Sequence, residues 1–154
     1  MADRPKQHPF LRGRYQGPMF ADAAGFLFIS PKGKILILKR AGKSKWAGRW
    51  ASSGGRIDEG ETPMGAAVRE TIEEIGALPL YCKPMNMVKL HWMGVLYCTW
   101  VVSTPIEFPP RKLDKKEHSQ WRWVTPDEIE SGKYPLHDGF AQTLKLAMPD
   151  VFGK

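Results

Sequence analysis

Cysteine is scarce in this chain, and long apolar runs are missing from it. The two cysteines, Cys82 and Cys98, match no metal-ligand spacing, and one pair is too few for the disulfide framework of a small secreted protein. No stretch approaches the roughly 20 apolar residues of a membrane-spanning helix. Residues 1–20 are basic but lack the apolar core and cleavage site of a secretory signal. We therefore expect a soluble, cytoplasmic protein with a basic N-terminal arm over residues 1–20.

Positive charge, by contrast, is abundant. The 154 residues carry a formal net charge of +7, which is typical of proteins that bind nucleic acid, nucleotides or other phosphates, although many basic proteins bind none. The length suits one compact domain, and an apolar content of 42% is ordinary for a globular protein. We expect a single domain over residues 1–154.

Short β-rich runs make up most of the chain. The runs AGFLFIS and KILILKR, joined by PKGK, predict a hairpin, and the Gly- and Ser-rich residues 41–55 predict a loop or irregular strand. Further strands are expected in residues 81–92, 94–104 and 119–125, a proline-rich loop in 104–118, a helix start at Thr125 and a closing helix in 138–148. This order favours an α+β fold or an α/β/α sandwich with a mixed sheet.

One helix is bounded by clear signals. Thr62 can cap its start, Pro63 suits its first position and Gly76 suits its end, so a helix is predicted from Pro63 to Ile75. On a 3.6-residue period its apolar face should hold Met64, Val68, Ile72 and Ile75, and three carboxylates should share the opposite face. These are the carboxylates of Glu70, Glu73 and Glu74.

Three neighbouring carboxylates on one helix repel one another. Residues 55–77 hold six acidic and two basic side chains, a net charge of −4, so the rest of the chain carries +11. A charged cluster is usually a solvated helix face. A cluster of acidic side chains in an otherwise basic chain also suits the binding of a hard divalent cation, such as Mg²⁺ or Mn²⁺, that joins protein carboxylates to substrate phosphates.

The segment Gly55 to Ala77 resembles the Nudix box, which is a Gly, five residues, a Glu, seven residues, then Arg-Glu, an aliphatic, any residue, Glu-Glu, any residue, Gly and an aliphatic. The seven fixed positions are matched by Gly55, Glu61, Arg69, Glu70, Glu73, Glu74 and Gly76. The aliphatic positions depart from the pattern, since they hold Thr71 and Ala77. Family members often have Leu-Pro before the paired glycines, where this chain has Ser52 and Ser53.

The resemblance implies a Nudix fold, in which a mixed sheet lies between helices and the box forms a loop-helix-loop. It implies Mg²⁺- or Mn²⁺-dependent hydrolysis of a nucleoside diphosphate linked to another moiety. Glu73 and Glu74 would bind metal, and Glu70 would bind metal or act as general base. The Gly55 carbonyl would contact the metal, Arg69 would orient the glutamates, and Glu61 would support the loop-helix junction.

Several residues outside the box are further candidates. Glu117 precedes the last strand and is either a further ligand or base, or a surface charge. Two cations at the end of the second strand are candidates for phosphate binding or are ordinary surface charges, and three tryptophans near predicted loops are candidates for stacking on a nucleobase. The cations are Lys39 and Arg40, and the tryptophans are Trp46, Trp50 and Trp92.

The sequence leaves the substrate open among nucleotides, nucleotide sugars and dinucleotides, because no subfamily landmark follows the box. Removal of pyrophosphate from RNA 5′ ends is a second hypothesis, favoured by the positive charge outside the box. A non-catalytic nucleotide-binding module is a third, disfavoured by the complete set of glutamates. The oligomeric state is also open, and a homodimer is one of the options.

Overall fold

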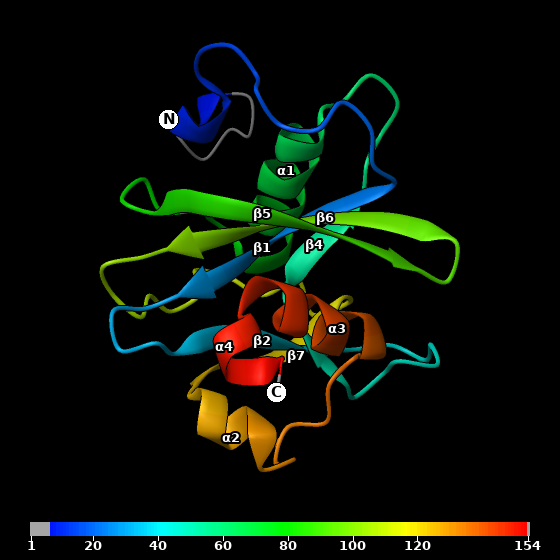
Figure 1. Cartoon of the computed structure of the whole chain (residues 1–154), viewed down its shortest axis with the longest axis vertical. Coiled ribbons are helices and arrows are strands. Elements are labelled where there is room, and N and C mark those ends of the chain that lie inside the picture. The colour runs from blue at the N-terminus through cyan, green and yellow to red at the C-terminus, as the bar shows by residue number, and fades with distance from the viewer. Residues whose placement is uncertain (1–6, 154) are drawn as a thin grey trace.

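The computed structural model describes residues 7–153, which form a twisted seven-stranded sheet with helices on both faces (Figure 1). The strands are β1 (Ala23–Ile29), β2 (Ile35–Arg40), β3 (Trp50–Ala51), β4 (Ser53–Arg56), β5 (Lys83–Trp92), β6 (Val95–Ser103) and β7 (His118–Val124). The helices are a 3₁₀ turn, η2 (Pro9–Leu11), and α1 (Pro63–Ile75), α2 (Pro126–Glu130), α3 (Asp138–Ala147) and α4 (Pro149–Phe152). No helix among residues 7–153 is long and apolar enough to cross a membrane.

The sheet is mixed, as predicted. Its main path runs β3-β2-β1-β6-β5, with β4 paired to β1 and β7 paired to β2. Strands β1 and β6 are parallel, and the other pairs are antiparallel. The strand predictions are confirmed, and the Gly- and Ser-rich residues 41–55 divide into a loop followed by the short strands β3 and β4.

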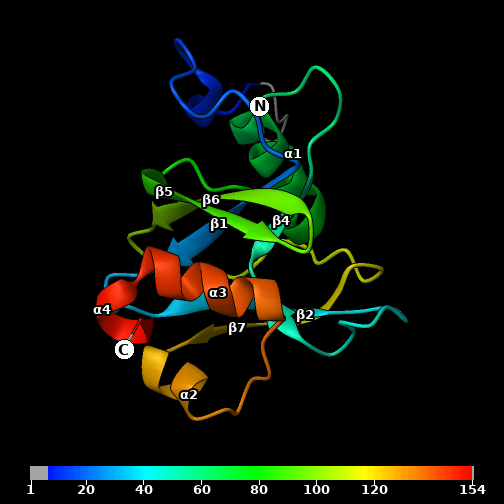
Figure 2. The same cartoon turned by 45° about the vertical axis from the view of Figure 1, so that its right-hand side comes forward.

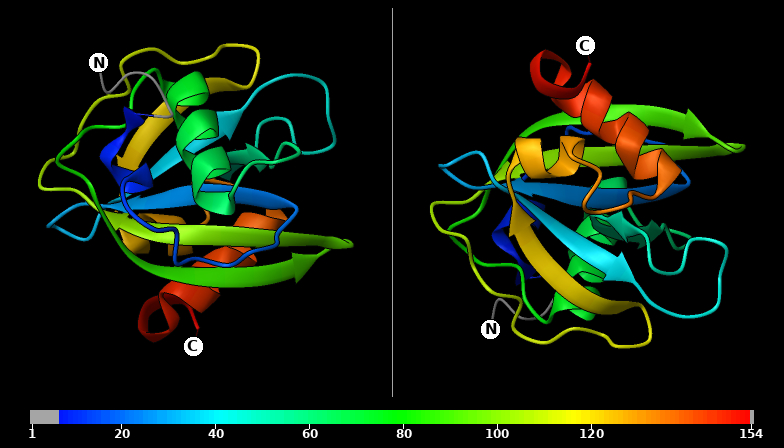
Figure 3. Two further views of the ribbon diagram at one scale, coloured as in Figure 1. Left: turned by 90° about the horizontal axis from the view of Figure 1, so that it is seen from above. Right: turned by 90° about the horizontal axis from the view of Figure 1, so that it is seen from below.

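The central strand β1 is buried on both sides because a helix layer covers each face (Figures 2 and 3). Phe26 and Phe28 point into the core beneath α1, whereas Leu27 points into the core beneath α3. This is the alternation that a strand between two helix layers requires. The prediction of an α+β sandwich is confirmed by this arrangement.

Strands β1 and β2 separate soon after the turn that joins them. Within the described chain their register is limited to Ile29 opposite Ile35. Beyond that point β1 pairs with β4 and β6, while β2 pairs with β3 and β7. The two halves of the sheet therefore diverge towards the start of β1 and the end of β2, and this divergence opens the space in which the candidate site lies.

The boundaries predicted for α1 are confirmed. The Thr62 side chain accepts a hydrogen bond from the Gly65 N–H at 3.0 Å, and Pro63 occupies the first turn. Gly76 ends the helix in the left-handed conformation with φ of 87°. These capping interactions are local in sequence, which is why the sequence alone locates both ends of the helix.

The N-terminal arm, as far as the structure describes it, packs on the same core as α1. Nε2 of the buried His8 lies 2.9 Å from the carbonyl oxygen of Leu78, and the Phe10 ring packs edge-on against the Phe26 ring. Residues 1–6 of the predicted arm lie outside the described residues.

Candidate metal and nucleotide site

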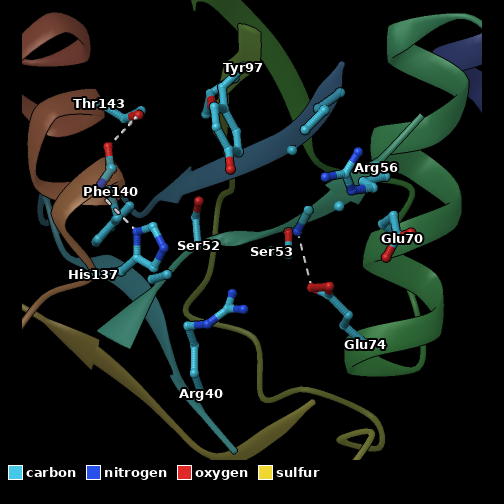
Figure 4. Close-up of a pocket in the computed structure, with 18 of the residues that line it drawn as sticks. Arg40, Ser52, Ser53, Arg56, Glu70, Glu74, Tyr97, His137, Phe140 and Thr143 are labelled. Carbon is cyan, nitrogen blue, oxygen red and sulfur yellow. Dashed lines mark hydrogen bonds between the residues drawn. The ribbon is translucent and has the colours of Figure 1, made fainter. Parts of the chain in front are cut away.

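A cavity of about 350 Å³ lies in the opening between the two halves of the sheet (Figure 4). Its walls come from the start of β1, the end of β2, the β3–β4 segment, α1, β6 and the first turns of α3. Side chains of three kinds line it. Carboxylates come from Glu70, Glu74 and Glu117, cations from Arg40 and Arg56, and a group of mostly aromatic side chains from Tyr97, His137, Phe140 and Thr143.

Arg69 is the centre of the acidic cluster. Its guanidinium bonds Glu61 through Nε at 2.8 Å and Glu70 through one terminal nitrogen at 2.9 Å, and that same nitrogen reaches Glu73 at 3.3 Å. The other terminal nitrogen of Arg69 lies 3.4 Å from a carboxylate oxygen of Asp58. The hydrogen bond to Glu61 is the main cause of the raised pKa of Arg69 and of the lowered pKa of Glu61. One arginine thus contacts four carboxylates, three of them from glutamates of the box.

Glu61 also ties the loop before α1 to the helix. Its carboxylate accepts the backbone N–H of Asp58 at 3.0 Å, while the Arg69 guanidinium donates to the Arg56 carbonyl at 3.1 Å. The loop of the box is therefore fastened to α1 by side chains that the box pattern fixes.

Glu74 is buried and does not lie on one open face with Glu70 and Glu73, so the prediction that the three carboxylates share the face opposite the apolar one is wrong for Glu74. Only 4% of the residue is exposed, because β4 packs across this part of α1. Its Oε1 accepts the Gly54 N–H at 3.1 Å and lies 3.2 Å from Nε2 of the buried His118. Burial raises the pKa of Glu74, and the two partners oppose that rise.

Glu70 lies directly against the glycine pair. A Cβ atom on Gly55 would come within 2.4 Å of the Glu70 carboxyl carbon, so a side chain at this position would push the Glu70 carboxylate away. Burial raises the pKa of Glu70, and the Arg69 hydrogen bond counteracts it. Of the predicted ligands, the structure therefore brings Gly55, Glu70 and Glu74 to one wall of the cavity. Glu73 does not line this wall. Its side chain is 55% exposed and points to Arg69.

No group of three or more Asp, Glu, His or Cys side chains within residues 7–153 is arranged to hold a metal ion as it stands. The donor chemistry nevertheless fits a hard divalent cation, since two partly or fully buried carboxylates and the Gly55 backbone face the same space. Arg69 donates hydrogen bonds to one carboxylate oxygen of Glu70 and to one of Glu73.

The cations at the end of β2 differ in position. Arg40 lines the cavity, and its buried Nε has no hydrogen-bond partner among the described residues. A buried donor without a partner costs free energy unless a ligand satisfies it. Lys39 pairs with Trp50 and Gln120 in the sheet and is not among the cavity-lining residues.

The three candidate tryptophans also differ. Trp46 and Trp92 pack on the ring of His137 at centroid distances of 4.7 and 4.8 Å, close to the aromatic end of the cavity. Trp50 is 5% exposed in the core beneath α3, where its ring meets Tyr134 edge-on. A covered ring offers no face to a nucleobase, so the stacking role predicted for Trp50 is not compatible with the structure.

Comparison with known proteins settles the family. The NUDIX domain model matches residues 19–146. The chain belongs to the Nudix family. Its sequence is 34% identical, over 141 residues, to a Mycobacterium tuberculosis protein provisionally named 8-oxo-dGTP diphosphatase 3, and the match covers 84% of this chain but 64% of that protein.

Two further likenesses extend along most of the Nudix chain. An RNA pyrophosphohydrolase from Erythrobacter litoralis is 28% identical over 149 residues, and the match covers 84% of this chain and 86% of that protein. The crystal structure of a Nudix hydrolase from M. smegmatis, RenU, has a TM-score of 0.65 and 28% identity, with 90% of this chain and 91% of RenU covered. The fold predicted from the Nudix box is confirmed.

The Nudix box forms only the acidic wall of the cavity. The opposite wall is supplied by residues that no sequence pattern indicated, namely Tyr97 on β6, His137 just before α3, and Phe140 and Thr143 within α3. No local pattern marks them, because they meet the box only through the tertiary fold. A turn of helix with a polar residue before it, as at His137, is a signal for capping rather than for ligand binding.

Proposed function

We propose that this chain hydrolyses the diphosphate linkage of a nucleoside diphosphate joined to another moiety, with Mg²⁺ or Mn²⁺ as cofactor. The observation that carries the proposal is the placement of carboxylates, an arginine whose buried Nε has no partner in residues 7–153, and an aromatic wall around one cavity of about 350 Å³. That volume lies at the lower end of ordinary ligand sites and suits a single nucleotide. Proteins of the Nudix family generally need a divalent metal.

The carboxylates of the acidic wall would bind the metal. Glu70, Glu73, Glu74 and the Gly55 carbonyl would hold the metal, which when bound screens phosphate charge and lowers the pKa of water. Arg69 holds Glu70 and Glu73 from the side of the helix that faces the loop.

On the substrate side, Arg40 would neutralise phosphate oxygens through its Nε, which has no hydrogen-bond partner in the described part of the chain. Glu117 is exposed, lines the same cavity as Glu74 and would accept the proton of the attacking water, with Glu70 as the alternative base. Arg56, on β4 beside Glu70, would supply a second positive charge to the diphosphate.

The test is turnover of a nucleotide panel with Mg²⁺, Mn²⁺ or EDTA, in which dNTPs, ADP-ribose, nucleotide sugars and dinucleoside polyphosphates are compared. We expect Glu74→Gln to lower turnover by roughly 100-fold or more, because even outer-shell changes at metal sites cost 10–100-fold. The amide can still accept from the Gly54 N–H, so the fold should persist. Glu130→Gln, an exposed change on α2, is the matched control. Unchanged turnover in Glu74→Gln would refute the assignment.

A second candidate is removal of pyrophosphate from RNA 5′ ends. The loop before β3 exposes Lys43, Lys45 and Arg49, and its Trp46 ring packs on His137 at the cavity. A strand of RNA leaving the cavity would meet these cations. Turnover of 5′-triphosphorylated RNA that falls steeply with salt, and falls further in Lys43→Gln, would favour RNA over a small nucleotide. Tight nucleotide binding with no turnover of any substrate would instead indicate a binding module.

A further inference from the structure

The side chain of His118 is turned towards the acidic wall of the cavity by a β-bulge. Strand β7 places Gln120 opposite Lys39 of β2, but His118 lies opposite Arg40, so Ser119 is an extra residue in β7. In a regular strand His118 would share the exposed face of Gln120. The shift of one residue places it instead on the side that packs against α1, where it is 2% exposed.

The ring of His118 approaches Glu74 without forming a hydrogen bond. Its Nε2 lies 3.2 Å from Glu74 Oε1, but the contact does not meet the geometry of a hydrogen bond, and neither ring nitrogen has a hydrogen-bond partner among residues 7–153. Burying polar atoms without partners costs folding free energy, so a native protein that does so needs a reason. At catalytic sites such contacts are often poorly aligned and tighten only when ligands bind.

Glu74 is held by the protein through one of its two carboxylate oxygens. Oε1 accepts the Gly54 N–H at 3.1 Å, a bond drawn in Figure 4, and it is the oxygen that His118 approaches. Oε2 accepts no hydrogen bond from residues 7–153. Because Glu74 lines the cavity, Oε2 is the oxygen that remains open to a ligand.

The backbone before His118 ties the loop that carries Glu117 to the same glutamate. The Asp114 N–H donates to the Glu74 carbonyl at 2.8 Å, and the N–H groups of Glu117 and His118 donate to the Asp114 carbonyl at 3.0 and 2.8 Å. The Glu117 carbonyl accepts the Ala41 N–H at 2.8 Å, just after β2. Segment 114–118 is therefore fastened to the last turn of α1, and the His118 ring is its side-chain contact with Glu74.

We propose that His118 is a positioning residue for the metal site, whose Nε2–H holds Oε1 of Glu74 beside the Gly54 N–H so that Oε2 is left for the metal. The inference rests on the proposed function, which makes Glu74 a metal ligand. An ionised carboxylate only accepts hydrogen bonds, so the ring nitrogen that faces it carries the proton. His118 itself is not among the cavity-lining residues and acts through Glu74.

Variants at position 118 separate positioning from packing. His118→Gln keeps an N–H donor at about the reach of Nε2, whereas His118→Leu fills the buried space and removes the donor. His118→Phe, which keeps a ring without a donor, is the second variant of this kind. Because the ring nitrogens have no hydrogen-bond partner in the described chain, we expect His118→Leu to be no less stable to urea in EDTA than the wild type. The exposed His91 on β5 provides the matched control, as His91→Leu.

Mn²⁺ binding is measured without nucleotide, from the electron paramagnetic resonance signal of the free ion. We expect Glu74→Gln, His118→Leu and His118→Phe to weaken Mn²⁺ binding by roughly tenfold or more, because partners that orient a metal ligand typically contribute 10–100-fold to metal affinity. His118→Gln should stay within about threefold of the wild type, and His91→Leu should bind as the wild type does. A purely structural role for His118 would instead lower stability together with affinity.

Wild-type Mn²⁺ affinity in both His118→Leu and His118→Phe would overturn the proposal, and so would a loss in His118→Gln as large as theirs. If Glu74→Gln alone then lost Mn²⁺ affinity and turnover, the proposed function would stand without this role for His118. Mn²⁺ affinity that requires both Glu74 and His118, in a protein that hydrolyses no member of the nucleotide panel, would support the positioning role and refute the proposed activity. A wild type that binds no Mn²⁺ would overturn both.

Discussion

Two of the positions at which the chain departs from the sequence usual in Nudix proteins touch each other. Ser53 Oγ and Thr71 Oγ1 lie 2.8 Å apart in a buried hydrogen bond between β4 and α1. The residues are 4% and 0% exposed. Apolar residues at both positions would pack in the ordinary way, whereas one hydroxyl without the other would be buried and unpaired. The free energy of unfolding should therefore depend on whether both hydroxyls, only one or neither is present.

Thr71→Val preserves shape but leaves the Ser53 hydroxyl without its partner, at a cost of about 2 kcal/mol in the free energy of unfolding. Ser53→Ala should cost less, about 1 kcal/mol, because a helical threonine can turn its hydroxyl to the carbonyl one turn earlier. The double variant leaves no unpaired hydroxyl. Its loss should be about 1–2 kcal/mol smaller than the sum of the two single losses.

The assay is urea unfolding of the four proteins in EDTA, followed by tryptophan fluorescence and circular dichroism. Both probes must give coincident transitions for the free energies to be compared. If the double variant lost the sum of the single losses to within about 0.5 kcal/mol, the two hydroxyls would be independent and the reasoning would be refuted.

Two further predictions concern pH and thiol chemistry. Arg69 lowers the pKa of Glu61, so this carboxylate stabilises the fold above its ordinary value of 4.5 and loses that contribution as pH falls through the lowered pKa. Urea unfolding of Glu61→Gln should show a loss at pH 7 that shrinks towards pH 3, and a loss independent of pH would contradict this. Burial raises the pKa of Cys82 and Cys98 to about 11, so neither thiol should react with a thiol reagent at pH 8 until denaturant is added. Fast labelling of the native protein would refute it.

Features with local causes were predictable from sequence. The limits of α1 follow from Thr62, Pro63 and Gly76, which act within one turn of the helix ends. The start of α2 follows in the same way from Thr125, which forms a capping box with Glu128. Such signals need no knowledge of the rest of the fold.

Features that depend on distant partners were not predictable. Helical periodicity places Glu74 beside Glu70, but the burial of Glu74 comes from β4 and from His118, which is 44 positions later in the sequence. Trp50 sits in a glycine-rich segment that is predicted as a loop or irregular strand, and nothing local predicts that it packs against Tyr134 in the core. In both cases the contacts that decide the environment join segments that periodicity treats separately.

The same distinction separates the chemistry of the site from its selectivity. The acidic wall is carried by 23 consecutive residues, so a sequence pattern can identify it and the hydrolytic chemistry it serves. The aromatic wall is assembled from β6, from α3 and from His137 just before α3, with Trp46 and Trp92 packed on His137, and no short pattern contains it. Changes at Glu74 should therefore remove turnover of every substrate to a similar extent, whereas changes at His137 should alter which nucleotide is preferred. The residues on the α3 side of the cavity, which lie outside the box, should therefore determine which substrate is bound.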